Sequence, residues 1–180
     1  RYAGYMTINI SSPNTEGLRN FHAEKEMSNL LIGLNKIKKN KNINQPIAIK
    51  LSPDIDNEKI SMIIELVNKN NIQGIIVSNT TDSNRENLSD TKRNEVGGLS
   101  GQPLKNISTK LIKKFYRETK GKVKIIGVGG IDSGQSAFEK IAAGADAVQL
   151  YTGMVYKGPG IVKEIKKKFI SILKKENLKN

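Results

Sequence analysis

The chain has 180 residues, of which 37% are hydrophobic and 26% charged, and its formal net charge is +13 at pH 7. This length fits one globular domain, since domains typically take roughly 100 to 200 residues. Cysteine is absent and His22 is the single histidine, which excludes disulfides, a cysteine nucleophile and metal sites built from thiolates or several histidines. Because no apolar run approaches the roughly 20 residues that span a bilayer, we expect this stretch not to be membrane-spanning by its own sequence.

The positive charge allows two interpretations. Lysine is spread with asparagine and isoleucine through the polar stretches, and it is densest in residues 161–180, which hold seven lysines. A nucleic-acid-binding surface concentrates basic residues among aromatic or glycine residues. The even spread favours a composition bias on solvated faces, and a basic nucleic-acid-binding domain remains the competing hypothesis from another functional class.

Five short apolar runs rich in β-branched residues predict five strands. They are Tyr5–Ile10, Ile47–Leu51, Gly74–Ser78, Val123–Val128 and Ala147–Tyr151. The runs are nearly continuous, which is typical of parallel strands buried on both faces.

A segment with helical spacing follows each run. The apolar stripes are Met27, Leu30, Leu31, Leu34 and Ile37; Ile60, Ile63, Ile64 and Val67; Ile107, Leu111 and Phe115; Ala137, Ile141 and Ala142; and Val162, Ile165, Phe169 and Ile172. Asp132 or Ser133 is the expected N-cap of the fourth helix. Residues 38–45 are expected to form a polar insertion, and residues 81–103 a long loop of the kind that is usually functional or disordered.

The repeated strand and helix predict an α/β fold. Five units in 180 residues average 36 residues each, so eight units would need roughly 290, within the range of a (β/α)₈ TIM barrel. The first strand follows Arg1 almost directly, with no helix before it. We therefore predict that residues 1–180 are the C-terminal part of a single barrel domain and hold about its last five units. A doubly wound sheet would place a glycine-rich loop after an early strand, whereas the glycine-rich turns here follow the fourth and fifth.

Polar residues follow every predicted strand. They are Asn9–Thr15, Lys50–Pro53, Ser78–Thr81, Gly127–Asp132 and Tyr151–Gly153. Barrel enzymes build their sites at these strand ends, and a phosphate commonly binds after the last two strands. Together the five ends offer amides and hydroxyls for a flat polar ligand, one cation, and two glycine-bearing loops for a phosphate.

Lys50 lies inside an apolar run, and a buried ammonium needs an anion or hydrogen-bond acceptors. Its partner is either a ligand or Asp54. His22 is expected at the surface, so no Ser-His-Asp arrangement is available, and the strand ends carry no paired carboxylates. These absences disfavour acid–base hydrolysis and favour chemistry performed by a bound cofactor.

The motifs resemble those of dihydroorotate dehydrogenase, in particular its class 2, quinone-dependent and membrane-associated form. The matching strings are Asn9–Arg19, Ile49–Pro53, Ser78–Thr81, Gly97–Leu104, Gly127–Asp132 and Gln149–Gly153. The resemblance implies oxidation of dihydroorotate to orotate in pyrimidine synthesis, with FMN as hydride acceptor and ubiquinone or menaquinone as final acceptor. A fumarate- or NAD-coupled relative is the alternative within enzymes.

The resemblance also assigns roles to residues. Ser12 falls on the catalytic base that takes the substrate's C5 proton while the C6 hydride goes to flavin N5, and Thr15 is its candidate partner through a water. Lys50 matches the lysine at the pyrimidine edge of the flavin. Asn9, Asn14, Asn79 and Thr80 match substrate-binding residues, Asn9 and Ser78 are further FMN contacts, and Gly101, Gly129, Gly130, Tyr151 and Thr152 match the flavin and phosphate cradle.

The family's N-terminal membrane-binding helices and first three barrel strands have no counterpart in these residues. Through that part, the resemblance implies peripheral membrane association, on the cytoplasmic side of a bacterial inner membrane or at the mitochondrial inner membrane in a eukaryote. We expect residues 1–180 alone to be inactive.

Overall fold

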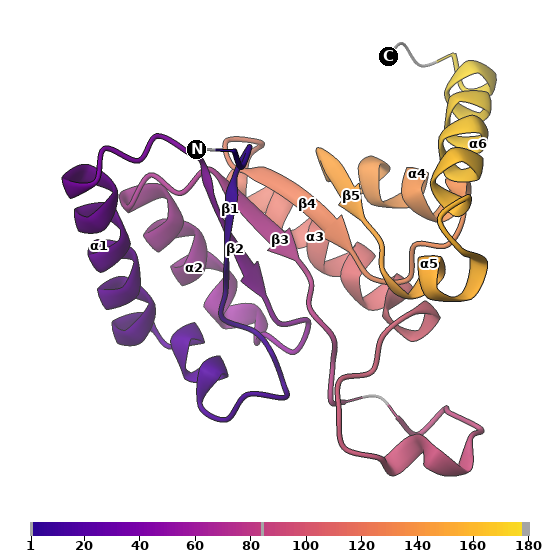
Figure 1. The fold of residues 1–180 in the computed structure, drawn as a ribbon, viewed down its shortest axis with the longest axis horizontal. Helices are drawn as coiled ribbons and strands as arrows, with labels where there is room; N and C mark the ends of the chain where they lie inside the picture. Colours follow the sequence, from indigo (N-terminus) through magenta and orange to yellow (C-terminus); the bar gives the residue numbers. More distant parts are fainter. Residues whose placement is uncertain (1, 84, 178–180) are drawn as a thin grey trace.

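The computed structural model describes residues 2–83 and 85–177. Five parallel strands form one sheet in chain order, as Figure 1 shows. They are β1 (Met6–Asn9), β2 (Ile47–Leu51), β3 (Gly74–Val77), β4 (Lys124–Val128) and β5 (Ala147–Gln149). Asn9 is paired with Lys50 in the register, and Lys50 with Ile76. The five predicted runs are thus the five strands, with ends that differ by at most two residues.

The longer helices lie along the outside of the curved sheet (Figure 1), where α1 contacts α2, α2 contacts α3, α3 contacts α4, and α4 contacts α6. They are α1 (Glu24–Asn40), α2 (Asn57–Lys69), α3 (Lys105–Thr119), α4 (Gly134–Ala142), α5 (Thr152–Lys157) and α6 (Ile161–Lys175). Short 3₁₀ turns cover Leu18–His22, Thr91–Asn94 and Gln102–Leu104. A parallel sheet with its crossover helices on the outer face is the arrangement of a segment of a (β/α)₈ barrel.

The core lies between the sheet and α1, α2 and α3, and it is almost entirely aliphatic. Leu31, Ile49, Ile63 and Ile75 are fully buried there, and so is Phe115, while Phe21 packs against this core from a half-buried position. Burying such a side chain stabilises the fold by about 1.5–3 kcal/mol. The core therefore fixes the central strands whose carboxyl ends carry polar residues.

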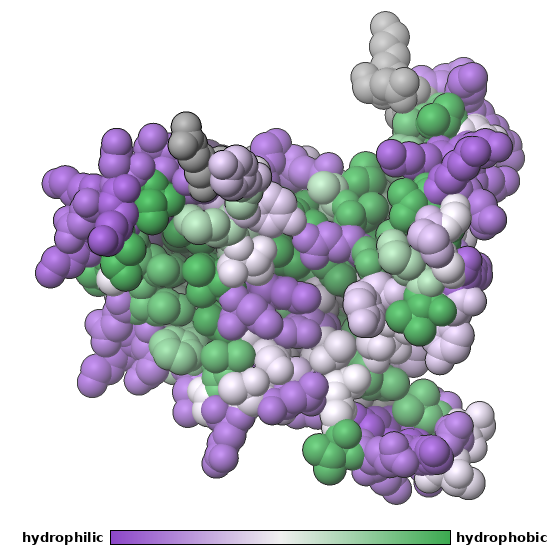
Figure 2. Space-filling view, viewed as in Figure 1, coloured by the Kyte–Doolittle hydropathy of each residue, from purple (hydrophilic) through white to green (hydrophobic). Residues whose placement is uncertain are grey.

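The two outer strands are less buried than the sequence predicts. β3 is buried throughout, whereas β1 alternates between half-buried and exposed residues and β5 has no buried residue. The reason is positional, because β1 pairs only with β2 and β5 only with β4 among the described residues. Figure 2 shows apolar side chains (green) on the face viewed there, between polar rims.

One prediction about local structure was wrong, and one helix was missed. Residues 38–45 are not all an insertion, because α1 continues to Asn40 and Lys38 Nζ donates to the Gln45 carbonyl at 3.0 Å. Lysine is a good helix former, and a positive charge in the last turn favours the helix dipole. The six-residue helix α5 was not predicted. The expected cap of α4 is confirmed at Ser133, whose Oγ accepts from the Ser136 N–H at 3.1 Å.

Candidate active site

A cavity of about 700 Å³ opens at the carboxyl ends of β2, β3, β4 and β5. This volume is in the usual range of ligand and cofactor pockets, about 300–1,000 Å³. Nine of the predicted site residues line it: Lys50, Ser78, Asn79, Thr80, Gly101, Gly129, Gly130, Tyr151 and Thr152. Parallel strands end at the same edge of a sheet, so residues from distant parts of the sequence meet around one space.

The turn after β4 approaches the start of α3 so closely that it has room only for glycine. Gly129 and Gly130 have φ angles of +114° and +69°, and a Cβ on Gly130 would lie 2.6 Å from Lys105 Cα. Neither glycine N–H donates to an acceptor within residues 2–83 and 85–177. Unpaired N–H groups at a glycine turn form a concavity that suits an anion.

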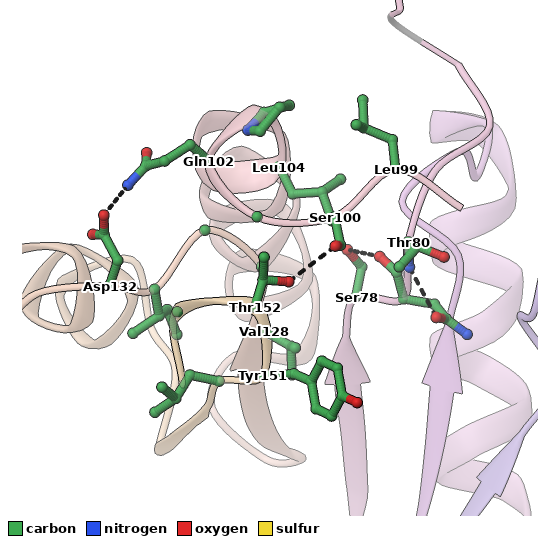
Figure 3. Close-up of a pocket in the computed structure, with 18 of the residues that line it drawn as sticks. Ser78, Thr80, Leu99, Ser100, Gln102, Leu104, Val128, Asp132, Tyr151 and Thr152 are labelled. Carbon is green, nitrogen blue, oxygen red and sulfur yellow. Dashed lines mark hydrogen bonds between the residues drawn. The ribbon is translucent and has the colours of Figure 1, made fainter. Parts of the chain in front are cut away.

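Hydroxyl and amide groups line the same cavity from the neighbouring loops, as Figure 3 shows. Thr152 Oγ1 donates to Ser100 Oγ at 2.9 Å, which joins the start of α5 to the long loop after β3. Gln102 donates to the carboxylate of Asp132. These bonds fix the cavity wall across three strand ends.

Lys50 presents its half-buried ammonium to this cavity from the end of β2. It forms no ion pair and no hydrogen bond with any other described residue. Asp54 is engaged elsewhere, since its carboxylate contacts Arg19 at 3.1 Å and accepts from Thr81. The alternative that Lys50 pairs with Asp54 is therefore wrong. Burial lowers the pKa of Lys50, and a cation held in this way favours an electron-rich ligand.

Asn9 lies beside the cavity wall rather than in it. Its Oδ1 accepts from Asn79 Nδ2 at 3.2 Å and from Ser11 Oγ at 2.9 Å. Asn79 also donates to Ser11 Oγ at 3.0 Å, and its Oδ1 accepts from the Thr80 N–H at 2.8 Å. The ends of β1 and β3 are thus joined through fixed amides, which is how a site orients a polar ring.

Ser12, Asn14 and Thr15 follow β1 on a loop outside the main cavity. Ser12 is half-buried, and its Oγ accepts from the Asn14 N–H at 3.2 Å. No direct hydrogen bond joins Ser12 to Thr15 among the described residues. Asn14 lines a second, smaller cavity of about 350 Å³ under the long loop. The loop after β1 nevertheless lies close to the main site. Gly98 of the long loop contacts both, since a Cβ on Gly98 would clash with Thr80, which lines the main cavity, and would lie 3.0 Å from Pro13 on the loop after β1.

His22 is buried, so the prediction that it lies at the surface was wrong. Only 6% of its surface is exposed. Its Nδ1 lies 3.1 Å from the Arg19 carbonyl, and the Ser52 N–H donates to Nε2 at 3.5 Å. Burial lowers the pKa of His22. The histidine joins the loops after β1 and β2 and lies outside the cavity lining.

The long loop 81–103 is anchored at both ends. Thr81 and Leu99 exchange backbone hydrogen bonds at 3.2 and 2.6 Å. Arg19 bridges to Asp82 at 2.9 Å and to Asp54 at 3.1 Å, and its hydrogen bond lowers the pKa of Asp82. Between the anchors, Arg85 donates to the carbonyls of Arg93, Glu95 and Gly97. The segment projects beyond the strand ends (Figure 1), beside both cavities.

The sequence patterns missed the fully buried Lys140 on α4. The available signal was its spacing, because Lys140 lies three residues after Ala137 and therefore shares its inward face. Cavity residues Ser100, Gln102 and Asp132 were also not predicted as site residues, since they lie in turns where polar residues are common for other reasons.

A family model described as "Dihydroorotate dehydrogenase" matches residues 1–173. The chain belongs to the dihydroorotate dehydrogenase family. A curated member, "Dihydroorotate dehydrogenase (quinone)" of Trichodesmium erythraeum, is 47% identical over 170 residues, which cover 89% of this chain and 44% of that protein. The protein of the same name from Escherichia fergusonii is 46% identical over 169 residues, 91% of this chain and 50% of that protein.

Solved structures of the family match the fold. The dihydroorotate dehydrogenase of Eimeria tenella in complex with ferulenol has a TM-score of 0.92 at 33% identity, covering 97% of this chain and 51% of that chain. Its ligand-free form has a TM-score of 0.93, also at 33% identity, covering 99% and 54%. The predicted fold class, a part of a TIM barrel, is confirmed. The chain spans about half the length of the dihydroorotate dehydrogenases that it matches.

Proposed function

We propose that residues 1–180 are the C-terminal part of a single-domain, quinone-dependent dihydroorotate dehydrogenase, which oxidises dihydroorotate to orotate in pyrimidine biosynthesis. The observation that carries the proposal is the strand-end cavity, in which Lys50 and the Gly129–Gly130 turn face one space. Family relatives whose names specify a quinone support the choice of electron acceptor.

The donor set of the cavity suits FMN. The chemistry that FMN supplies when bound is acceptance of a hydride and delivery of the electrons to ubiquinone or menaquinone. The free N–H groups of Gly129 and Gly130, with Gly101 and Thr152 beside them, would hold its phosphate. Lys50 would bind its electron-rich ring edge, where an ammonium finds the anionic partner that the described chain does not give it. Ser78, Asn9 and Tyr151 would complete the contacts.

The substrate would bind next to these residues, at the ends of β1 and β3. Asn9, Asn14, Asn79 and Thr80 present amides and a hydroxyl, which suit the carboxylate and ring carbonyls of dihydroorotate. Ser12 would take a proton from the substrate, and Thr15 would pass that proton on through a water. A serine hydroxyl is a weak base on its own, so such a path is required.

The quinone and the membrane would be met by the part of the family fold that these residues do not hold. No helix within residues 2–83 and 85–177 is long and apolar enough to cross a bilayer. Peripheral attachment, to the cytoplasmic side of a bacterial inner membrane or to the mitochondrial inner membrane in a eukaryote, is the location that fits a quinone acceptor.

The decisive test is the full-length gene product. We expect a yellow protein with FMN bound stoichiometrically, which reduces a quinone at the expense of dihydroorotate. Preferential reduction of fumarate or NAD would support the related alternative instead. A flavin-free protein with salt-sensitive binding to random-sequence duplex DNA would contradict the proposal.

Gly130→Ala should remove most of the flavin from the full-length protein. The new Cβ would approach the backbone of Lys105 to 2.6 Å, and neither segment can move without opening the cradle. Overpacking of this kind costs about 1–3 kcal/mol, so we expect FMN affinity to fall by roughly tenfold or more. The measurement is FMN content after purification, followed by titration.

Gly158→Ala is the matched control. Gly158 has almost the same φ, +71°, but open space where a Cβ would be. It therefore reports backbone strain alone and should retain its flavin. Equal flavin loss in both variants would mean that the close approach at Gly130 is unimportant.

A further inference from the structure

Lys140 is a buried cation without an anionic partner. It is fully buried on the inner face of α4. Its Nζ donates to three neutral oxygens, each at 2.6 Å: the Lys105 carbonyl, Ser108 Oγ and Thr109 Oγ1. The neighbouring Glu139 carboxylate contacts Lys105 Nζ at 3.0 Å. Three protons thus meet three acceptors, which satisfies the ammonium, but its charge is not neutralised by contact with any described carboxylate.

All three acceptors belong to the first turns of α3, which form the floor beneath the glycine turn after β4. A Cβ on Gly129 would lie 3.0 Å from Ser108 Oγ, and one on Gly130 would lie 2.6 Å from Lys105 Cα. Lys140 therefore fixes the start of α3, against which the Gly129–Gly130 turn packs.

One hydroxyl connects the lysine to the turn. Ser108 Oγ accepts from Lys140, and its own proton has two carbonyls within reach, that of Leu104 at 2.9 Å and that of Gly129 at 3.2 Å. In a trans peptide the C=O and the next N–H point in opposite directions. The Gly129 carbonyl faces Ser108, so the Gly130 N–H points away from Ser108. Ser108 does not line the cavity, whereas Gly129 and Gly130 do, and the Gly130 N–H therefore points toward the cavity side of the turn.

We propose that Lys140 is a positioning residue for the phosphate of FMN. It holds the first turn of α3 under the Gly129–Gly130 turn, and its charge supplies the positive potential behind that turn. This inference rests on the proposed function, because it takes FMN as the ligand of the cavity. A buried charge acts over several ångströms with little screening, so an anion bound across the turn would be its counter-charge.

Affinity for FMN and riboflavin distinguishes this role from a structural one, since the two ligands differ only in the phosphate. Apoprotein of the full-length gene product is titrated with each ligand for the unmodified protein and for Lys140→Met. We expect FMN affinity to fall about tenfold, which is the scale of one charge pair at partial burial, and riboflavin affinity to stay within about twofold. A lysine that merely joins α3 to α4 would weaken both ligands alike.

Lys124→Met is the matched control. Lys124 begins β4 at the end of the strand away from the cavity, is exposed, and pairs with Asp146 at 2.7 Å. The Lys124→Met substitution removes the same charge from the same pair of elements, β4 and α4, and should leave the affinity for both flavins unchanged. A tenfold loss for FMN in this variant as well would mean that net charge, not Lys140, is responsible.

A pH series keeps the proposal testable if Lys140→Met fails to fold. Burial lowers the pKa of Lys140 to about 8, with Glu139 opposing and Lys105 adding to the shift. The second phosphate ionisation, near pH 6, is complete above pH 7. As pH rises through 8 Lys140 loses its charge, so FMN affinity of the unmodified protein should fall more than riboflavin affinity between pH 7 and 9. Burial also lowers the pKa of Lys50, but loss of its charge would weaken both flavins alike, because Lys50 would contact the ring that they share.

Different outcomes would contradict the role of Lys140 and the proposed function. Loss of FMN and riboflavin affinity in equal measure, or an FMN affinity that does not change with pH relative to riboflavin, would overturn the role of Lys140 and leave the proposed function standing. A full-length protein that binds neither flavin would instead refute the proposed function.

Discussion

Ser12→Ala should lower the turnover of the full-length enzyme by about 10²- to 10⁴-fold, the usual loss on removing a general base. FMN should remain bound, because Ser12 lies on the loop after β1 and not in the lining of the main cavity. The measurements are turnover with dihydroorotate and a quinone, and the flavin content of the purified variant.

Two further variants serve as a control and as a test of the role of Ser12. Ser61→Ala makes the same change on the exposed face of α2 and should leave turnover unchanged. Ser12→Cys should retain part of the activity with a pH profile shifted to lower pH, since a thiol ionises near pH 8.5, far below a hydroxyl. Turnover of Ser12→Ala close to that of the unmodified enzyme would exclude Ser12 as the base.

The sequence predicted the strand ends well because two independent signals coincide there. An apolar run marks a buried strand, and its abrupt change to polar residues marks the edge where a barrel binds its ligand. Lys50 is one such residue. A cation between Ile49 and Leu51 requires a partner, and the structure places its ammonium in the cavity with no acid of the described chain beside it.

Other residues could not be predicted, because their environments depend on contacts distant in sequence. His22 is buried by the loop after β2, through Ser52, thirty positions along the chain. Lys140 is satisfied by acceptors on α3 that lie more than thirty positions before it. Composition treats such residues as surface residues, since lysine is rarely buried unless paired. Whether such a residue is buried is decided by the side chains and carbonyls that other elements place around it.

The extent to which the outer strands β1 and β5 are buried could also not be predicted from the sequence. The apolar residues of β1 and β5 are only partly covered, whereas β3 is buried throughout. Apolar residues indicate that a strand is suited to burial, whereas the area that is actually buried depends on whether another strand pairs with its free edge.

Residues 1–180 produced by themselves should have no dihydroorotate oxidation activity and should be insoluble or only partly ordered. The sheet has two edges, at β1 and β5, and an unpaired edge beside apolar surface is a template for aggregation. Tyr5, Tyr151, Val155 and Tyr156 are exposed near these edges. In a closed barrel every edge is paired and the interior is filled by side chains.

The comparison is between this 180-residue chain and the full-length gene product, prepared in the same way and measured by thermal unfolding, FMN stoichiometry and turnover. The full-length protein should melt cooperatively with one FMN bound, whereas the isolated chain should show a broad transition and little flavin. The cradle residues are present in both proteins, so a difference in flavin content would come from the missing units, which close the sheet and are expected to carry part of the substrate and flavin contacts. A monomeric, cooperatively melting 180-residue protein that binds FMN and oxidises dihydroorotate would refute this reasoning, because it would show that five βα units with two open edges suffice for both fold and activity.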